Sequence, residues 1–364
     1  MAKRSVIPWL LVVGIGAVAG ALAATGRHPL ALGRRGLSTA PPRPEIALHV
    51  GSELSAAAWS LRDTLGQVPK TIREALGFAP ENLAWREDLE LPPLTYELRI
   101  RGLAVGRGQL RPSGLLAIQT VGTAEGQLPG EPFTEVVTNR SGVWIEEQDA
   151  GQARLLGYDV LHPSFIMALH VDTLVRRHLH EMLTREETHH ILDHARRFIP
   201  RTVDELCSRL AVGQIQQVLK NLLREQVSLR DLGFVVETMA DAAGEDIDTD
   251  TLTERVRLGL RRQLSRDLCG PDNELRVLPL GTRWEQLRTH SFTDENLKPL
   301  IAQLRERLAD GRDSLQRPVL LAPHDLRLKT RRALERDLPD LPVLSEREVD
   351  PSIQVIRLPD LVLL

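Results

Sequence analysis

Five of the eleven histidines in this chain gather in the segment "RHLHEMLTREETHHILDHARR", residues 177–197. Imidazole nitrogens are common ligands of zinc and iron, so the segment raises the hypothesis of a membrane-anchored metalloenzyme. His190 and His194 lie four residues apart and share one face of a helix, but a catalytic zinc takes three protein ligands. A third ligand would have to come from another segment. The clustered residues are His178, His180, His189, His190 and His194.

The zinc-protease pattern of two histidines four residues apart, with glutamate after the first, fails here. It begins correctly at His180 and Glu181, but the second histidine position is Thr184. Thr184 and Glu187 instead form a capping-box pattern, which predicts that a new helix starts at residue 185. His178 and His180 then belong to a different helix from the other three histidines.

A structural interpretation of the histidines fits the hydrophobic pattern better. On the predicted helix after residue 184, His190 and His194 border an apolar stripe, and His178 is in step with apolar residues before it. We therefore expect no catalytic residues, no metal and no cofactor, and keep the metalloenzyme built on residues 178–194 as the alternative. The stripe consists of Ile191, Leu192, Ala195, Phe198 and Ile199, and the residues in step with His178 are Val171, Leu174, Val175 and Met182.

The elements around this segment indicate an α/β region, a small insertion, a helical block and a final α/β unit. Alternating patterns predict strands in the first and last parts, and helical spacing predicts helices between them. One stripe in 212–226 is formed by Ile215, Val218, Leu219, Leu222 and Leu223. The predicted strands are 45–50, 96–110, 115–120, "EVVT" (135–138), "GVWIEE" (142–147), 274–280, 318–323, 341–345 and 353–358; the predicted helices are 56–78 with a break near Pro69, several within 163–267, 293–310 and 325–337.

The N-terminal residues differ in composition from the rest. Residues 6–25 carry no charge and are long enough to span a ~30 Å hydrocarbon core as a helix. A signal peptide with "ALA" at 21–23 as its cleavage site is the competing interpretation. Residues 26–44, rich in Gly, Pro and Arg, are typical of a linker.

Overall composition limits the function classes. The chain of 364 residues is 42% hydrophobic and 26% charged, which is enough for a globular body with a core. A net charge of -3 gives no electrostatic reason to expect a nucleic acid as partner. Cys207 and Cys269 are the only cysteines, so a disulfide framework is not expected.

Several long strips resemble the cytoplasmic part of the FHIPEP family, the flagellar FlhA and injectisome SctV export gates of type III secretion. They include residues 157–193 and "QIQQVLKNLLREQVSLRDLGFVVETMADAA" (214–243), together with "LELPPLTYELRI" (89–100), "GRGQLRP" (106–112) and "GTAEGQLPGEP" (122–132). The similarity runs in unchanged order from about residue 45 to 364. It is weakest after 265.

The resemblance implies four subdomains after the predicted membrane helix and linker. A first α/β subdomain is split by a small inserted one, and a helical subdomain and a C-terminal α/β subdomain that forms the ring follow. The implied limits are 1–26 for the membrane helix, 27–44 for the linker, 45–120 and 157–178 for the first subdomain, 121–156 for the insertion, 179–265 for the helical subdomain and 266–364 for the last.

The resemblance also implies a binding function without bond-making chemistry. The body would lie in the cytoplasm beneath a single pass through the bacterial inner membrane and form a homo-oligomeric ring, expected to be a nonamer. Its implied partners are secretion chaperones, export substrates, other membrane proteins of the export apparatus and the secretion ATPase complex. The cleft that would receive chaperones is lined by Glu135, Thr138, Trp144, Tyr158, Asp159 and Leu169.

Two departures from the family pattern stand out. Family members carry a multi-helix membrane domain before this part, so the chain is either a fragment of a longer reading frame or a truncated paralogue. Where the family often has "FGLPAVW", this chain has "TNRSGVW" (138–144), so an aromatic residue near the implied chaperone pocket is Thr138. This difference favours an injectisome or a diverged system over a flagellar one. The choice between flagellar and injectisome systems stays open.

Overall fold

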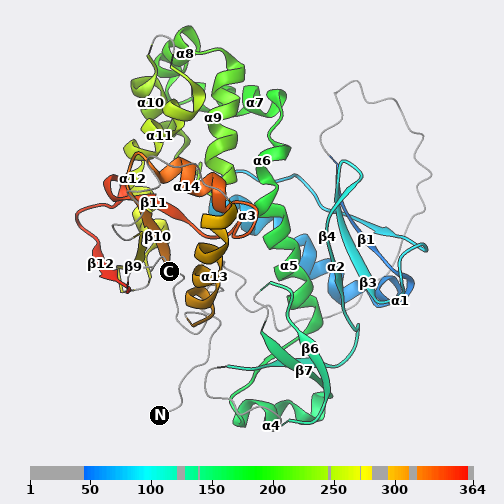
Figure 1. Cartoon of the computed structure of the whole chain (residues 1–364). Coiled ribbons are helices and arrows are strands. Elements are labelled where there is room, and N and C mark those ends of the chain that lie inside the picture. Colours follow the sequence, from blue (N-terminus) through cyan, green and yellow to red (C-terminus); the bar gives the residue numbers. More distant parts are fainter. Residues whose placement is uncertain are drawn as a thin grey trace, which may run out of the picture.

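A computed structural model describes residues 45–120, 128–137, 140–244, 247–270, 272–280, 294–310 and 318–359. The body is a mixed α/β structure, as predicted, with three four-stranded sheets and a helical block. The helical block lies at the top of Figure 1, and the first sheet and the C-terminal sheet lie below it on opposite sides. Helix α5 (Pro163–Arg177) connects the helical block with the strands β6 and β7 at the bottom of the view.

The first sheet has the strand order β2-β1-β3-β4, in which only β1 and β2 are parallel. Its strands confirm the predictions for 45–50 and 96–110. The helix predicted over 56–78 is broken at Gln67, and Pro69 sits in the first turn of the second piece, where its missing N–H costs nothing. The elements are β1 (Ile46–Val50), α1 (Ser52–Ala56), α2 (Ala58–Gly66), α3 (Val68–Leu76), β2 (Ala84–Glu87), β3 (Thr95–Ile100) and β4 (Leu103–Gln109).

The second sheet, ordered β6-β7-β5-β8, is antiparallel and contains strands from both sides of the predicted insertion. Strand β7 confirms the prediction for 142–147, but the strand expected at 135–138 is wrong, because β6 lies earlier. The carboxylate of Glu135 accepts a 2.6 Å hydrogen bond from the Val137 N–H and closes a turn there. The elements are β5 (Leu115–Ile118), β6 (Glu131–Thr134), β7 (Ser141–Ile145), η2 (Glu147–Asp149), α4 (Ala150–Leu155) and β8 (Asp159–Leu161).

The helical block confirms the predicted helical character of 163–267. Helix α7 starts at residue 185 as predicted, because the Thr184 hydroxyl accepts a 3.1 Å hydrogen bond from the Glu187 N–H. All five residues of the predicted stripe in α9 are buried. The helices after α5 are α6 (Leu179–Met182), α7 (Arg185–Arg196), α8 (Pro200–Arg209), α9 (Val212–Arg224), α10 (Leu232–Ala242), α11 (Thr249–Gly259) and α12 (Arg261–Leu268).

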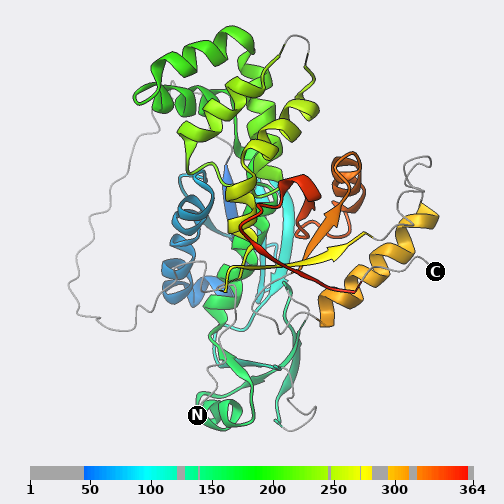
Figure 2. The ribbon, with the colours of Figure 1, turned by 90° about the vertical axis from the view of Figure 1, so that its left-hand side faces the viewer.

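The C-terminal sheet has the order β11-β10-β9-β12 with all neighbours parallel. One face joins the main hydrophobic core of the first sheet and the helical block, and the other packs with α13 in a smaller core. Figure 2 shows this sheet and α13 beside the first sheet. The four predicted strands and two predicted helices are confirmed as β9 (Glu274–Pro279), α13 (Asp294–Asp310), β10 (Val319–Ala322), α14 (Arg327–Leu334), β11 (Val343–Ser345) and β12 (Gln354–Arg357), with a short η4 (Glu346–Glu348).

The membrane helix predicted at 6–25 and the linker at 27–44 lie outside the described residues. Among the residues that the structure describes, no helix is both long and apolar enough to cross a bilayer.

Candidate functional site

The clustered histidines do not converge on one point. His189, His190 and His194 are exposed on α7, and the nearest carboxylate contact of His190 is 3.7 Å from Nε2 to Glu186. The Nδ1 atom of His178 lies 2.7 Å from the Glu181 carboxylate. Across the described ranges there is no group of three or more His, Cys, Asp or Glu side chains that could hold a metal ion. The metalloenzyme alternative is therefore not favoured.

The predicted apolar stripe on α7 is wrong at one position. Leu192 and Ala195 are buried, but Phe198 is 74% exposed and packs its ring edge-on against His194, with 5.5 Å between ring centroids. The reason is local, because α7 ends at Arg196 and Phe198 lies beyond the last helical residue. Helical spacing no longer determines where its side chain points.

The residues expected to line a docking cleft come from several elements of the second sheet and from α5. Glu135 and Trp144 lie on the β6–β7 hairpin, and both are buried. Tyr158 belongs to the small core beneath α4, Asp159 begins β8, and Leu169 is buried on α5. The sixth expected residue, Thr138, lies outside the described residues.

Three contacts position Trp144 and Asp159. The Trp144 indole packs edge-on against Phe133, with 5.5 Å between centroids, and the Arg111 guanidinium lies 5.8 Å from the indole centroid. Asp159 carries its carboxylate 3.8 Å from Nη2 of Arg140. The second sheet therefore holds four of the six expected residues on one scaffold, and Leu169 is on the helix that joins this scaffold to the rest.

A buried polar cluster that the sequence analysis missed lies where the second sheet meets the first. The Tyr96 hydroxyl on β3 and Nδ1 of His170 on α5 are 2.9 Å apart. Burial and then the Glu135 charge raise the pKa of Tyr96 above its usual range, which places Glu135 near this pair. Burial and then the Arg177 charge lower the pKa of His170 to about 4. Tyr96 and His170 are therefore both neutral at neutral pH, as expected of a structural contact.

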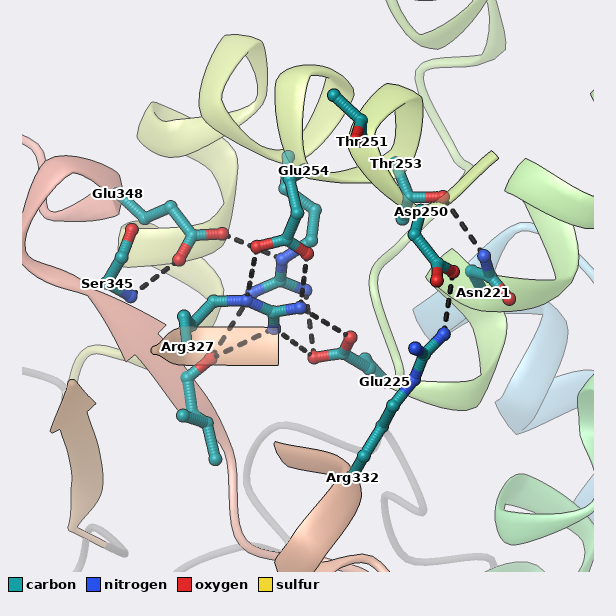
Figure 3. A network of polar contacts seen from close by, with 12 residues as sticks. Asn221, Glu225, Asp250, Thr251, Thr253, Glu254, Arg327, Arg332, Ser345 and Glu348 are labelled. Atoms are coloured by element: carbon teal, nitrogen blue, oxygen red, sulfur yellow. Dashed lines mark hydrogen bonds and ion pairs between the residues drawn. The ribbon is translucent and has the colours of Figure 1, made fainter. Parts of the chain in front are cut away.

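A second cluster missed from the sequence is a buried network of charges between the helical block and the C-terminal unit (Figure 3). Arg327 on α14, which is fully buried, donates to Glu225 at 2.5 Å from Nη1 and to Glu254 at 2.7 Å from Nε. Arg257 on α11 donates from Nε to Glu348 at 2.7 Å and approaches Glu225 at 3.3 Å. Both guanidiniums thus contact Glu225, and the carboxylates of the network come from three segments of the chain.

The electrostatics of this network keep Glu225 ionised. Burial opposes ionisation of Glu225, but the Arg257 and Arg327 guanidiniums outweigh it and lower the pKa of Glu225 to about 2. Burial raises the pKa of Glu254, partly offset by Arg327. The arrangement joins the helical block to the C-terminal unit. Spacing along the sequence could not reveal it, because directly bonded members such as Arg327 and Glu225 lie 102 residues apart.

A further ion pair joins the C-terminal unit to α5. The Arg177 guanidinium donates two hydrogen bonds to the Asp340 carboxylate, at 2.9 Å from Nε and 2.5 Å from Nη2. Bidentate pairs of this kind fix orientation as well as distance. The C-terminal unit is therefore joined by ion pairs to both the helical block and α5.

Comparison with known proteins agrees with the resemblance in sequence. The chain is 32% identical over 321 residues to the flagellar biosynthesis protein FlhA of Yersinia enterocolitica, an alignment that covers 86% of this chain and 45% of FlhA. The chain therefore spans less than half the length of this relative.

Solved structures share the fold. CdsV in the Chlamydia pneumoniae CdsV and CdsO complex superposes with a TM-score of 0.74 at 21% identity, covering 88% of this chain and 99% of CdsV. The nonameric SctV-C of EPEC superposes with a TM-score of 0.69 at 20% identity, covering 89% of this chain and all of SctV-C. The sequence matches the FHIPEP family over residues 37–354, most of its length. The chain belongs to the FHIPEP family.

Proposed function

We propose that this chain is an export-gate component of a type III protein secretion system, and that its folded body is a platform for assembly and docking. The observation that carries the proposal is the family match over residues 37–354, together with 32% identity to a flagellar FlhA along 86% of the chain. A binding role also fits the polar clusters, whose buried groups join parts of the body and do not converge on a reaction site.

The body assembles as a homo-oligomeric ring, with nine copies as the expected number. This is supported by the shared fold with a nonameric SctV-C over 89% of the chain. The C-terminal unit is held by the Arg327 network and the Arg177–Asp340 pair, so neighbouring copies meet surfaces of fixed shape. Weak contacts suffice in such a ring, because closure makes the last contact intramolecular.

The second sheet and α5 carry the docking cleft for chaperones and export substrates, with Glu135, Thr138, Trp144, Tyr158, Asp159 and Leu169 in or behind its wall. Trp144, Tyr158 and Leu169 are mostly buried, so their role is to support the wall. The secretion ATPase complex is a further partner, for which the solved complex of CdsV with CdsO is the precedent. Other membrane proteins of the export apparatus complete the set of partners.

Residues 6–25 anchor the body to the bacterial inner membrane as a single helix, and the linker 27–44 connects this helix to the body in the cytoplasm. The body then has four subdomains: 45–120 with 157–178, the insertion 121–156, the helical 179–265 and the C-terminal 266–364. Strands β5 and β8, which flank the insertion in the sequence, share a sheet with β6 and β7 inside it.

Deleting the gene in its own bacterium tests the proposal. We expect the type III secretion or flagellar assembly of that cell to stop, and a plasmid copy of the gene to restore it. A matched plasmid carrying the Arg327→Ala variant, in which two partly buried carboxylates lose one partner each, should restore it poorly. Normal export from the deletion strain, with no second copy of the gene, would contradict the proposed function.

A further inference from the structure

Three cations from distant parts of the sequence lie close together beside α6. Arg101, in the turn between β3 and β4, donates from Nη2 to the Glu181 carbonyl at 3.2 Å. Lys220 and Arg224 lie four residues apart on α9 and therefore share one face of that helix, against which α6 packs. We call Arg101, Leu103, Lys220 and Arg224 the α9 patch.

The turn holds Arg101 in an uncommon backbone conformation. Arg101 has φ 53° and Gly102 has φ 80°, so both lie in the left-handed region, which L-residues other than Gly, Asn and Asp seldom adopt. The Arg101 N–H also donates to the Glu45 carbonyl at 2.8 Å. A residue suited to the turn would be Asn or Gly. The turn instead carries a guanidinium, fixed over α6, and such a departure points to a role for the charge.

The carboxylates nearby already have partners. Glu181 contacts His178 at 2.7 Å, and Glu335 forms an ion pair with Arg224 at 3.6 Å. Lys220 makes no ion pair with any residue in the described part of the chain. Burial and then the Arg101 and Arg224 charges lower the pKa of Lys220, and these two charges outweigh Glu181. The Lys220 ammonium therefore lies near two other cations and has no ion-pair partner among the described residues.

An exposed apolar side chain follows Arg101 on the same hairpin. Leu103 is 74% exposed and lies two residues beyond Arg101. Single exposed leucines are ordinary, but this one follows a guanidinium that a strained turn holds in place. Together they offer an apolar contact next to positive charge, the complement of a segment that mixes acidic and apolar residues.

We propose that the α9 patch docks an acidic protein segment that also carries an apolar residue. Carboxylates of the segment lie against Lys220 and Arg224, and its apolar side chain covers Leu103. For its biological meaning this inference rests on the proposed docking function, since it names the chemistry of one partner segment. The site lies on α9 and the β3–β4 turn, apart from the second sheet that carries the cleft.

Fluorescence anisotropy of a labelled, short synthetic peptide rich in glutamate and leucine tests the inference, with the full chain in detergent. The same peptide with lysine in place of glutamate is the peptide control. The test variant is Lys220→Glu with Arg224→Glu. The matched control is Lys70→Glu with Arg201→Glu, which changes the charge equally at two exposed residues that make no ion pair with described residues.

We expect binding of the glutamate peptide, no binding of the lysine peptide, and a loss of about tenfold or more in affinity for the α9 variant only. The affinity should fall as salt rises past ~0.1 M, where the Debye length is ~10 Å. Equal affinity of wild type and the α9 variant would overturn the inference. So would binding of phosphatidylserine vesicles without peptide binding, which would mean a membrane contact.

Sedimentation of the same variants separates this inference from the proposed function. Intact assembly with lost peptide binding supports a docking patch, whereas a change of oligomeric state in the α9 variant alone would mean an interface between copies and would overturn it. If the peptide fails to bind wild-type chain that still assembles, the inference fails and the proposed function stands.

Discussion

The Arg257 guanidinium donates from Nε to the Glu348 carboxylate at 2.7 Å, and the two side chains are 2% and 3% exposed. The pair connects α11 of the helical block with η4, which follows β11. The second Glu348 oxygen accepts from the Ser345 N–H at 2.6 Å, so one carboxylate serves both a side chain and the backbone. Such a buried pair contributes little net stability over apolar packing, but losing one partner is costly.

Replacing Glu348 by glutamine should lower the free energy of unfolding by about 3 kcal/mol, because Arg257 would keep its buried charge and lose an anionic partner. Chemical denaturation followed by circular dichroism measures the effect. The control is Glu346→Gln in the same turn, where the side chain is exposed and a change within about 0.5 kcal/mol is expected. Equal effects of the two substitutions would show that the buried charge pair does not hold the C-terminal unit.

Gly77 should not tolerate alanine. It ends α3 with φ 75°, and an added Cβ would lie 2.7 Å from the Arg230 backbone nitrogen. Gly77→Ala should therefore destabilise the protein by about 1–3 kcal/mol, in thermal or chemical unfolding. Gly66→Ala at the end of α2 is the control, because nothing lies within 4 Å of its Cβ position and its φ is ordinary. That change should be neutral or slightly stabilising; a reversed order of the two effects would refute the assigned backbone.

Stability should fall on acidification from about pH 6.5 to pH 4, in part through His170. Its folded pKa of about 4 lies below the value of 6.5 expected for the unfolded chain, so the unfolded state binds the proton first. The contribution is complete above pH 6.5 and is lost as pH falls towards 4. His170→Gln keeps a partner for the Tyr96 hydroxyl but does not titrate, so its unfolding free energy should vary less over this window.

His180 also has a pKa of about 4, lowered by burial and then by Arg224, so the His170→Gln protein should retain part of the slope. His190→Gln, at an exposed position on α7, is the matched control and should leave the slope unchanged. A slope identical in all three proteins would contradict the assignment to His170.

The sequence predicted the elements well wherever local patterns dominate. The apolar stripe of α9 and the cap at Thr184 both depend on neighbours within a few residues, and both were found at the predicted positions. The strand expected at 135–138 failed because the Glu135 carboxylate binds the backbone of its own turn, a competition that β propensity does not register. The prediction that Phe198 is buried was wrong because α7 ends at Arg196, two residues before it.

The candidate sites were less predictable. The histidines cluster in the sequence but not in the fold. Arg327 and Glu225, which join the C-terminal unit to the helical block, belong to no sequence motif and meet only after folding. The cleft residues, including Glu135 and Trp144, rested on resemblance alone. No rule of spacing links them, because their positions depend on strand register and on the packing of α5.

The central claim is that the folded body assembles into a ring that serves as a docking platform. Electron microscopy of the purified full chain in detergent, over a range of protein concentrations, tests it most directly. We predict closed rings with nine-fold symmetry whose subunits match the fold described above. Particles that remain single subunits at the highest concentration attainable, with the fold intact by circular dichroism, would contradict the account.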